Sequence, residues 1–525
     1  MANSKFYVTT PIYYVNDVPH IGHAYTTIAA DVLARYHRAL GDDVRFLTGT
    51  DEHGQKVAET AAAKGLQPIE LANQNVVCFQ ELWKLLNITH DDFIRTSEPR
   101  HESRVKTLVQ RLVDAGHIYQ GSYEGWYDVG QEEFVTETEA AANQFKSAVN
   151  GKPLTRYSEP SYFFRMSQFQ QRLLDHIAAH PEFIEPGSRR NEVVSKVSAG
   201  LRDLSVSRAS LAWGVQMPND PAHTLYVWID ALFNYYTAVG GGQPGEPGEL
   251  AKYWPADVHL IGKDILWFHA VIWPCVLMAL DVPLPGKIFA HGWWTHAGQK
   301  MSKSLGNFVV PAKIIDATDA KGAAIGVDRF RYFVLREVPF GQDGDFSFSQ
   351  LVSRCNGELA NNVGNLLSRT VNMIGRYFDG RIPPPGEPTA AEQPVRERID
   401  RFAADLDSAL NDLAFQRAIV VALDLASAAN KYIDDTAPFK LAKDPTQRDR
   451  LGTILYTCAE ATRLVALALA PFMPTTIERV WQQLPYRPEP GEFLSAQLSW
   501  GKLKPGATVT RGDALFPRLE EEKPV

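Results

Sequence analysis

Cysteine is scarce in this sequence, and no apolar run is long enough to cross a membrane. The 525 residues include four cysteines, Cys78, Cys275, Cys355 and Cys458, and these are widely scattered. This spacing excludes a local CxxC metal site and fits reduced thiols in a cytoplasmic protein. No apolar run approaches the ~20 residues that span a bilayer, and no basic segment followed by an apolar one opens the chain. We therefore expect a cytoplasmic protein with no signal peptide and no membrane partner.

An excess of positive charge is also missing. Lysine and arginine number 53 against 61 aspartate and glutamate residues, so the net charge is −8. Bulk charge therefore does not indicate a nucleic-acid partner, and an RNA partner would need a local basic face. The length and the hydrophobic content of 45% are sufficient for three or four domains with large cores.

The first informative stretch joins a predicted strand to a predicted helix. Phe6–Thr10 is β-branched and aromatic, as strands are, and apolar residues recur at helical spacing over Ile21–Tyr36. His20, Gly22 and His23 lie at the start of that helix. A helix N-terminus offers unpaired N–H groups and partial positive charge, which suit a phosphate, and Gly22 lets a ligand approach the backbone. Taken alone, such histidines are more often ordinary surface or core residues.

A second stretch far downstream changes this interpretation. It reads Lys300-Met301-Ser302-Lys303-Ser304, which alone would be a solvated lysine loop. Together with His20-Ile21-Gly22-His23, in this order and at this separation, it resembles the HIGH and KMSKS motifs of the class I aminoacyl-tRNA synthetases. We therefore expect both segments to serve one nucleotide.

The fold expected for residues 1–292 is α/β, with a Rossmann-type doubly wound catalytic domain. Residues 1–115 form its first half, with a second strand at Val44–Thr48. The loop 49–54 follows at the carboxyl end of that strand, where such folds bind ligands. Asp51 in this loop either caps the next helix or binds a substrate ammonium group.

The second half of the catalytic domain is predicted over residues 224–292. The run Thr224–Ile229 is almost continuously apolar, which predicts a buried parallel strand. Two further strands are predicted at Val258–Ile261 and Lys287–His291.

Residues 116–223 interrupt the α/β pattern and are predicted to be an inserted connective domain. In class I synthetases the connective peptide often carries a zinc knuckle built on cysteine pairs. Here Trp126–Gln131 stands where the first pair would be, and it contains no cysteine. Thiolate ligation is impossible, so we predict no structural zinc and no other metal site. Near the end of the insertion, Arg208 could be an ordinary surface charge.

The remaining residues are predicted to be mostly helical. Residues 293–348 hold the KMSKS loop and a stem-contact region with a helix at Asp328–Arg336. Residues 349–525 form an all-α helix bundle with a C-terminal tail, because apolar positions recur at three and four residues. The predicted helices span Leu359–Ile374, Ile399–Leu413, Ala418–Ile433 and Leu451–Leu469. The tail after Trp500 either packs on the surface or frays.

The resemblance implies a two-step reaction that uses ATP with Mg²⁺. The amino-acid carboxylate attacks the α-phosphorus of ATP, and the resulting aminoacyl-adenylate then gives its acyl group to tRNA. Positioning and charge stabilisation dominate such catalysis. The residues expected to bind ATP are His20, Gly22, His23, Gly262, Asp264, Lys300 and Lys303. The expected catalytic residues are His20, His23, Lys300, Lys303, Asp51 and Arg208.

Within the class, the chain resembles the methionyl-tRNA synthetase family over nearly its full length. The stretches that carry this resemblance are Pro11–Asn16, Tyr226–Ala231, Gly262–Ile265 with Phe268-His269, and Lys300–Ser304. The resemblance places Ile12, Tyr14, Trp228, Ala231, Leu232, Tyr235, Ile265 and His269 around the methionine side chain, with Asp51 at its amino group. A thioether packs well against aromatic rings, and a Tyr hydroxyl and a His N–H can reach the sulfur. The alternative for Trp228 and Tyr235 is plain core packing.

Family patterns vary at the pocket, which bears on specificity. Leu232 and Phe233 replace a proline and an aliphatic residue found in some members, so the shape of the pocket is left open. An apolar pocket separates near isosteres by only ~1–3 kcal/mol per methylene, so homocysteine is the difficult competitor. The insertion is short beside the editing insertions of the isoleucine, leucine and valine enzymes, so we expect any editing in the synthetic site.

The resemblance also assigns the helical region to anticodon reading. The expected anticodon-binding residues are Asn365, Arg369, Asn430, Pro438 and Phe439. Asn365 and Arg369 are four residues apart and share one helix face, which could also be an ordinary solvated face. Family members commonly have a tryptophan at the position of Phe439, which can still stack on a base. The implied partner is tRNA(Met), including the initiator tRNA, and the short tail favours a monomer.

Two alternatives remain open at this point. A class I synthetase for another amino acid, such as cysteine or leucine, would share both signature motifs. A catalytically silent paralogue that binds tRNA or a protein partner would share the fold. The intact His20, His23, Lys300 and Lys303 argue against the silent paralogue, and the absence of a thiol cluster argues against a cysteine enzyme.

Overall fold

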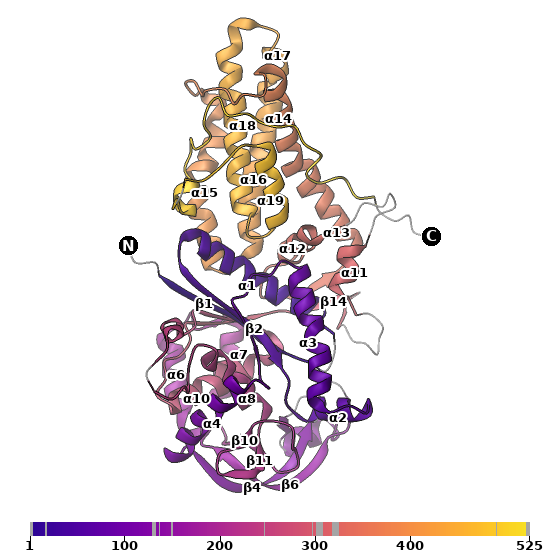
Figure 1. The fold of residues 1–525 in the computed structure, drawn as a ribbon, viewed down its shortest axis with the longest axis vertical. Helices are drawn as coiled ribbons and strands as arrows, with labels where there is room; N and C mark the ends of the chain where they lie inside the picture. The colour runs from indigo at the N-terminus through magenta and orange to yellow at the C-terminus, as the bar shows by residue number, and fades with distance from the viewer. Residues whose placement is uncertain are drawn as a thin grey trace. The chain divides into compact units, whose positions relative to one another are not determined.

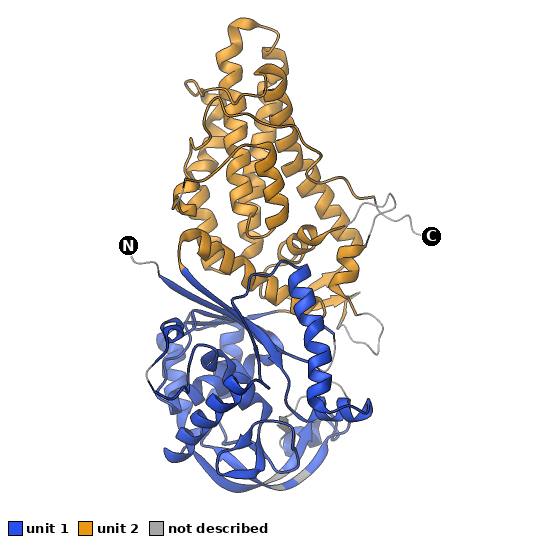
Figure 2. Cartoon of the chain, in the orientation of Figure 1, with its two compact units in different colours: residues 1–19, 43–291 blue, residues 20–42, 292–525 orange. Residues whose placement is uncertain are grey.

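The computed structural model describes residues 4–15, 18–128, 133–135, 137–148, 151–245, 247–296, 298–300, 308–317, 325–489 and 491–520 (Figure 1). The chain divides into two compact units (Figure 2). The first unit comprises residues 1–19 and 43–291, and the second comprises residues 20–42 and 292–525.

The first unit is built on a six-stranded sheet in which every neighbouring pair of strands is parallel. The strand order is β3-β2-β1-β12-β13-β7. The bounds are β1 Lys5–Tyr14, β2 Asp43–Asp51, β3 Asp92–Arg95, β7 Ile184–Glu185, β12 Val258–Gly262 and β13 Lys287–His291. Four predicted strands are thereby confirmed, and β2 extends three residues beyond its predicted end, to Asp51. The strand order reverses between β1 and β12, which makes this junction the switch point of a doubly wound sheet.

Helices and a buried apolar cluster complete this unit. The longer helices are α2 Gln55–Ala63, α3 Pro68–Leu85, α4 Pro99–Asp114, α6 Gln170–Ala179, α7 Gly187–Ser198 and α10 Trp273–Ala279. Tyr7 and Leu47 of the sheet and Trp273 of α10 belong to one buried cluster. Because both faces of a parallel sheet are covered, its strands read as apolar runs in the sequence.

The strand predicted at Thr224–Ile229 is wrong. Strand β11 covers Asp220–Leu225 and pairs antiparallel with β9 (Ser207–Arg208) and β10 (Gln216–Met217) in a small separate sheet. Helix α8 then covers Val227–Leu232, and α9 covers Asn234–Thr237. A short apolar run fits a buried strand and a buried helix equally well, so its periodicity did not distinguish them.

The segment expected to be an insertion contains a second antiparallel sheet. Its order is β5-β4-β6-β8, with β4 at Ile118–Asp128, β5 at Glu133–Val135, β6 at Thr155–Phe164 and β8 at Leu204–Ser205. In the region where the resemblance led us to consider a zinc knuckle, the Trp126 ring lies 4.7 Å from the Phe145 ring. Its indole N–H donates to Glu137 at 2.8 Å. The same segment also supplies β7, which pairs with β13 in the main sheet.

The second unit is mainly helical. Its bundle contains α14 (Asn365–Tyr377), α15 (Gln393–Asn411), α16 (Phe415–Thr436) and α18 (Arg448–Leu469), which pack along one another (Figure 1). These helices confirm the predicted bundle, and α12 (Val327–Arg336) confirms the helix predicted at 328–336. The signature helix α1 (Ile21–Leu40) also belongs to this unit, as do α13 (Phe348–Arg354), α17 (Pro438–Leu441) and α19 (Pro474–Gln483).

The tail packs rather than frays over its described part. Ile382 N–H donates to Ala507, Val509 N–H donates to Gly380, and Leu503 and Phe516 are buried. Within the described residues, the stretch Pro445–Leu469 is long and apolar enough to cross a membrane. However, its apolar window is entirely buried inside the protein, as in the core helix of a bundle.

Candidate active site

The switch point brings several of the predicted pocket residues to one edge of the sheet. Ile12 and Tyr14 lie near the carboxyl end of β1, and Tyr14 pairs with Asp51 at the end of β2. Gly262 ends β12, the neighbour of β1 on the other side. The register of β1 shifts between Thr9 and Ile12, a stretch that contains Pro11, which has no N–H for the ladder. Doubly wound sheets bind ligands at this edge.

Two aromatic rings of the first unit stack on one another. Trp228 of α8 lies parallel to Phe268, with ring centroids 3.8 Å apart and an interplanar angle of 6°. The edge of His269 meets Trp228, with centroids 6.4 Å apart. Phe268 was not among the predicted pocket residues. Its position directly before His269, in an aromatic stretch, was the sequence signal that could have identified it.

The Tyr235 hydroxyl and His269 form a buried hydrogen-bonded pair. His269 Nδ1 lies 2.9 Å from the Ile265 carbonyl oxygen, which can only accept, so Nδ1 carries the proton. Nε2 then accepts from the Tyr235 hydroxyl at 2.8 Å. Burial lowers the pKa of His269 to about 4, so the imidazole is neutral at pH 7. A sulfur that accepts a hydrogen bond from either residue must therefore displace one of these two hydrogen bonds.

Asp51 is almost fully buried beside Tyr14. The Asp51 carbonyl accepts from the Val15 N–H at 3.2 Å. The Tyr14 hydroxyl donates to the His53 carbonyl at 2.9 Å, which fixes that ring. The next residue, Glu52, is also buried and accepts hydrogen bonds from Thr50 and Arg95. A buried carboxylate in this setting suits a substrate ammonium group.

Arg208 is buried, so it is not a surface charge. Its guanidinium lies 4.5 Å from the centroid of the Tyr226 ring and 5.3 Å from that of Tyr127. Nη1 donates to the Ser207 carbonyl at 2.8 Å and to the Ser205 hydroxyl at 3.1 Å. Arg208 is therefore held against the ring of Tyr226, the residue that precedes α8.

The signature histidines form a compact cap at the start of α1. His20 Nδ1 accepts from the Gly22 N–H at 3.0 Å, and His23 Nδ1 accepts from the His20 N–H at 3.1 Å. The two rings stack with centroids 3.8 Å apart. Burial and the neighbouring His20 hold the pKa of His23 well below its usual value. Because each Nδ1 accepts, each neutral ring carries its proton on Nε2, the type of donor that a phosphate oxygen accepts.

The second signature cannot be compared in the same way. Met301–Ser304 lies outside the described residues, and for Lys300 only the backbone is described, in strand β15 (Gln299–Lys300). The predictions for Lys300 and Lys303 therefore stay predictions. Gly262 and Asp264 are placed, with Asp264 in the turn Lys263–Ile265 directly after β12.

A groove of about 710 Å³ in the second unit contains three of the five predicted anticodon residues. Asn365 donates to the Asn430 side-chain oxygen at 3.0 Å, and Asn430 donates to the Asn362 carbonyl at 3.0 Å. Arg369 pairs with Asp434 at 2.5 Å. The groove is lined by Arg336, Gly357, Glu358, Asn361, Asn362, Asn365, Arg369, Val420, Leu423, Asp424, Ser427, Asn430, Lys431, Asp434 and Asp435.

The remaining two anticodon residues lie on α17, directly after the helix that carries Asn430. Pro438 is buried, and the Phe439 side chain is 51% exposed. Neither residue is among those that line the groove. Solvent-exposed aromatic rings are the side chains on which proteins stack unpaired RNA bases. Over the described part of the chain, no group of three or more His, Cys, Asp or Glu side chains has the arrangement of a metal site.

Comparison with known proteins identifies the family. The family described as "tRNA synthetases class I (M)" matches residues 6–143 and 140–371, and "Anticodon binding domain of methionyl tRNA ligase" matches residues 382–524. The methionine–tRNA ligase of Caldanaerobacter subterraneus is 47% identical over 99% of this chain and 79% of its own length. That of Streptomyces coelicolor is 46% identical over 98% of this chain and 97% of its own.

This chain belongs to the methionyl-tRNA synthetase family. A solved structure agrees: "Mycobacterium tuberculosis methionyl-tRNA synthetase in complex with methionyl-adenylate" has a TM-score of 0.92 and 43% identity, covering 98% of this chain and 100% of that one. The chain is therefore an enzyme, a class I aminoacyl-tRNA synthetase that ligates methionine to tRNA. The alternatives of a cysteine or leucine synthetase and of a silent paralogue are thereby answered.

The fold class predicted for this member of the methionyl-tRNA synthetase family is confirmed. A parallel-sheet catalytic part and a helical anticodon-binding part are both present. The sequence analysis missed Asp230 of α8 and His101 of α4, two buried titratable residues that contact one another. No spacing in the sequence links residues so far apart, so only the fold could bring them together.

Proposed function

We propose that the enzyme first forms methionyl-adenylate from methionine and ATP at the switch point of the parallel sheet. It then transfers the methionyl group to the terminal ribose of tRNA(Met), with release of AMP and pyrophosphate. The observation that carries this proposal is the cluster of packed and hydrogen-bonded rings formed by Trp228, Phe268, Tyr235 and His269. Support also comes from the related protein whose solved structure is a complex with methionyl-adenylate.

Methionine is held at both of its ends in this proposal. The thioether packs against the apolar and aromatic side chains of Ile12, Tyr14, Trp228, Ala231, Leu232, Tyr235, Ile265 and His269. Sulfur near aromatic rings gains ~0.3–1.5 kcal/mol per contact. The buried Asp51 binds the ammonium group, which leaves the carboxylate to attack the α-phosphorus. Any editing of homocysteine occurs in the same site.

ATP is bound by the signature segments. His20 and His23 donate Nε2–H to phosphate oxygens at the start of α1, and Gly22 lets a phosphate approach the backbone. Lys300 and Lys303 neutralise the pyrophosphate as charge develops, a role that suits compact and mobile cations. Gly262 and Asp264 contact the nucleotide after β12. Mg²⁺ enters with ATP on its phosphates, since this ion is usually held by substrate phosphates rather than by an all-protein cage.

Arg208 acts at the reacting centre as a fixed cation. Its guanidinium is buried against Tyr226 and held by Ser205 and Ser207, so its position costs little further ordering on binding. Arginine keeps its charge when buried, which suits an oxyanion or phosphate partner.

The groove on α14 and α16 reads the anticodon of tRNA(Met), including that of the initiator tRNA. Asn365, Arg369 and Asn430 contact base edges, and Pro438 and Phe439 provide a stacking surface. The hydrogen bonds among Asn362, Asn365 and Asn430 orient these amides before RNA binds. We further propose a monomer in the cytoplasm.

The proposed division of labour follows the predicted boundaries. Residues 1–115 and 224–292 catalyse, 116–223 form the connective peptide, 293–348 carry the KMSKS loop and stem contact, and 349–525 bind the anticodon. The connective peptide is proposed to be free of zinc. The contacts of Trp126 with Phe145 and Glu137 take the structural role of a metal knuckle.

The test is ATP–pyrophosphate exchange with purified enzyme and its Trp228→Ala variant. Loss of the stacked ring removes an aromatic contact worth ~1–3 kcal/mol, so the methionine KM should rise about 5- to 150-fold. The ATP KM should change little. An unchanged methionine KM would place the thioether somewhere else.

A further inference from the structure

Asp230 is a buried carboxylate on α8, the same helix that carries Trp228, Ala231 and Leu232. Its Oδ2 accepts from His53 Nδ1 at 2.6 Å, and its Oδ1 accepts from His101 Nε2 at 2.9 Å. The side chain is 1% exposed. A buried carboxylate is costly unless it is paired, so both histidines are needed to keep it ionised there.

The electrostatics favour the charged forms of Asp230 and His53. Burial raises the pKa of Asp230, but the charges and hydrogen bonds of His53 and His101 outweigh burial and lower that pKa to about 2. Burial lowers the pKa of His53, but the Asp230 carboxylate, with smaller contributions from Glu102 and Glu52, raises it above its usual value overall. The contact between α8 and His53 is therefore a buried hydrogen bond that becomes an ion pair when His53 is protonated.

The first arm of the triad reaches the segment proposed to bind the ammonium group. His53 is two residues after Asp51, and its carbonyl accepts from the Tyr14 hydroxyl at 2.9 Å. Its ring meets the edge of Trp213, with centroids 5.1 Å apart, and the Trp213 indole donates to the Glu52 carbonyl at 2.6 Å. A shift of His53 would therefore move both Tyr14 and Asp51.

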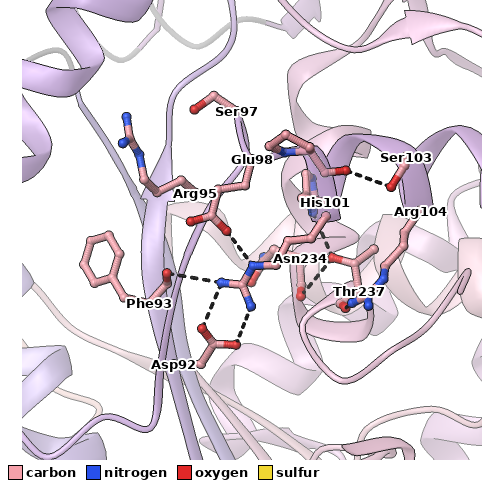
Figure 3. Close-up of polar contacts among 12 residues, drawn as sticks. Asp92, Phe93, Arg95, Ser97, Glu98, His101, Ser103, Arg104, Asn234 and Thr237 are labelled. Carbon is pink, nitrogen blue, oxygen red and sulfur yellow. Dashed lines mark hydrogen bonds and ion pairs between the residues drawn. The ribbon is translucent and has the colours of Figure 1, made fainter. Parts of the chain in front are cut away.

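The second arm ties Asp230 to a helix that is fixed to the sheet. His101 lies on α4, and its Nδ1 is 2.8 Å from the Thr237 hydroxyl of α9. Arg104, one turn further along α4, donates to the Thr237 carbonyl. At the start of α4, Arg100 holds both oxygens of Asp92 in β3, each at 2.9 Å. Figure 3 shows His101 and Arg104 directed at Thr237, beside Asn234, and the carboxylate of Asp92 in its two contacts.

We propose that Asp230 is a positioning residue for methionine, because its carboxylate fixes the aromatic wall on α8 against the segment Asp51–His53. The inference rests on the proposed methionine pocket, since both parts that Asp230 joins belong to it. Asp230 itself faces the two histidines and does not need to touch the substrate.

The test compares Asp230→Asn with a matched control. The amide keeps the size of the side chain but removes the charge. Its NH2 group cannot accept a hydrogen bond from an imidazole N–H. Asp42→Asn is the control, because Asp42 forms an equally short pair with His37, 2.7 Å from its Nδ1, at the far end of α1. Methionine and ATP KM values come from pyrophosphate exchange, and the fraction of active sites comes from the adenylate burst.

Removal of one charged hydrogen bond should raise the methionine KM of Asp230→Asn about 10- to 100-fold. The ATP KM should stay within about twofold, and Asp42→Asn should match the parent enzyme in both constants. A residue that only stabilises the fold would lower the active-site fraction and leave both constants unchanged, and that result would overturn the inference. An equal rise in both constants would also overturn it.

A second variant covers the case in which Asp230→Asn does not fold. His53→Gln removes the imidazole partner of Asp230 while keeping a neutral donor, and it should raise the methionine KM selectively. No change in that KM would refute the role of the first arm. Trp228→Ala separates the two levels: if that variant leaves the methionine KM unchanged, the pocket itself is misplaced and this inference falls with it.

Discussion

Arg369 is the residue at which stability and RNA reading separate most clearly. Its guanidinium pairs with Asp434, whose side chain is 66% exposed, and Arg369 itself is 28% exposed. Such a surface pair contributes no more than ~1 kcal/mol to folding. In contrast, a charged hydrogen bond to a base edge in the groove is worth ~1.5–3 kcal/mol. Arg369→Ala should therefore lower the free energy of unfolding only slightly.

The effect on tRNA should be much larger. A loss of ~1.5–3 kcal/mol raises the tRNA KM about 10- to 150-fold at ~1.4 kcal/mol per tenfold change. Adenylate formation needs no tRNA, so pyrophosphate exchange should be unchanged. Steady-state aminoacylation with tRNA(Met), pyrophosphate exchange and thermal unfolding measure the three quantities on one preparation.

Lys431→Ala is the matched control for Arg369. Lys431 lines the same groove and is also paired, with Asp435 at 2.9 Å. This pair lies within one helix, and the Lys431 side chain is 75% exposed. Its removal should change the tRNA KM only a few fold, through general electrostatics. Equal losses in both variants would show that the groove attracts phosphate rather than reading bases. A fall in pyrophosphate exchange with Arg369→Ala would contradict anticodon reading altogether.

Three further predictions concern the catalytic part. Tyr235→Phe leaves the buried Nε2 of His269 without its hydrogen-bond donor, at a cost of ~1–3 kcal/mol. Both the unfolding temperature and the affinity for methionine should therefore fall. An unchanged methionine KM would show that this pair does not belong to the pocket. Lys303→Ala should lower the rate of adenylate formation about 100-fold or more in rapid-quench experiments, and a change confined to methionine affinity would refute its assigned role. His53 has a raised pKa, so the stability it contributes is complete below its unfolded pKa of ~6.5 and is lost as pH rises through its folded pKa. The unfolding-temperature difference between the parent enzyme and His53→Gln should therefore shrink from pH 6 to pH 9, and a difference that grows over that range would reverse the sign of the argument.

Strong local patterns allowed four strands of the main sheet and the bundle helices to be predicted from the sequence. The strands at 6–10, 44–48, 258–261 and 287–291 and the bundle helices have clear periodicity and turn signals at their ends. The strand prediction at Thr224–Ile229 failed because a short run with five apolar residues fits either a strand or a helix, and the outcome depended on tertiary partners. In the helix that forms instead, the Asp230 carboxylate contacts His53 and His101 from elsewhere in the chain.

The candidate site was predicted where motifs carry it and missed where only packing does. Trp228, Tyr235 and His269 were named from resemblance, and the structure adds that Phe268 stacks on Trp228. The proton arrangement of Tyr235 and His269 could not be predicted, because it depends on the Ile265 carbonyl oxygen within the same helical turn. The irregular π-helical stretches at Phe268–Ile272 and Cys355–Gly364 also leave no trace in the sequence pattern.

The central claim is that the ring-walled site at the sheet's switch point selects methionine for reaction with ATP. Pyrophosphate exchange with the parent enzyme, measured separately with each of the twenty amino acids, tests it most directly. The account predicts rapid exchange with methionine and exchange at least about 100-fold slower with every other amino acid. Exchange that is fastest with leucine, cysteine or any other amino acid, or no exchange with any of them, would contradict it.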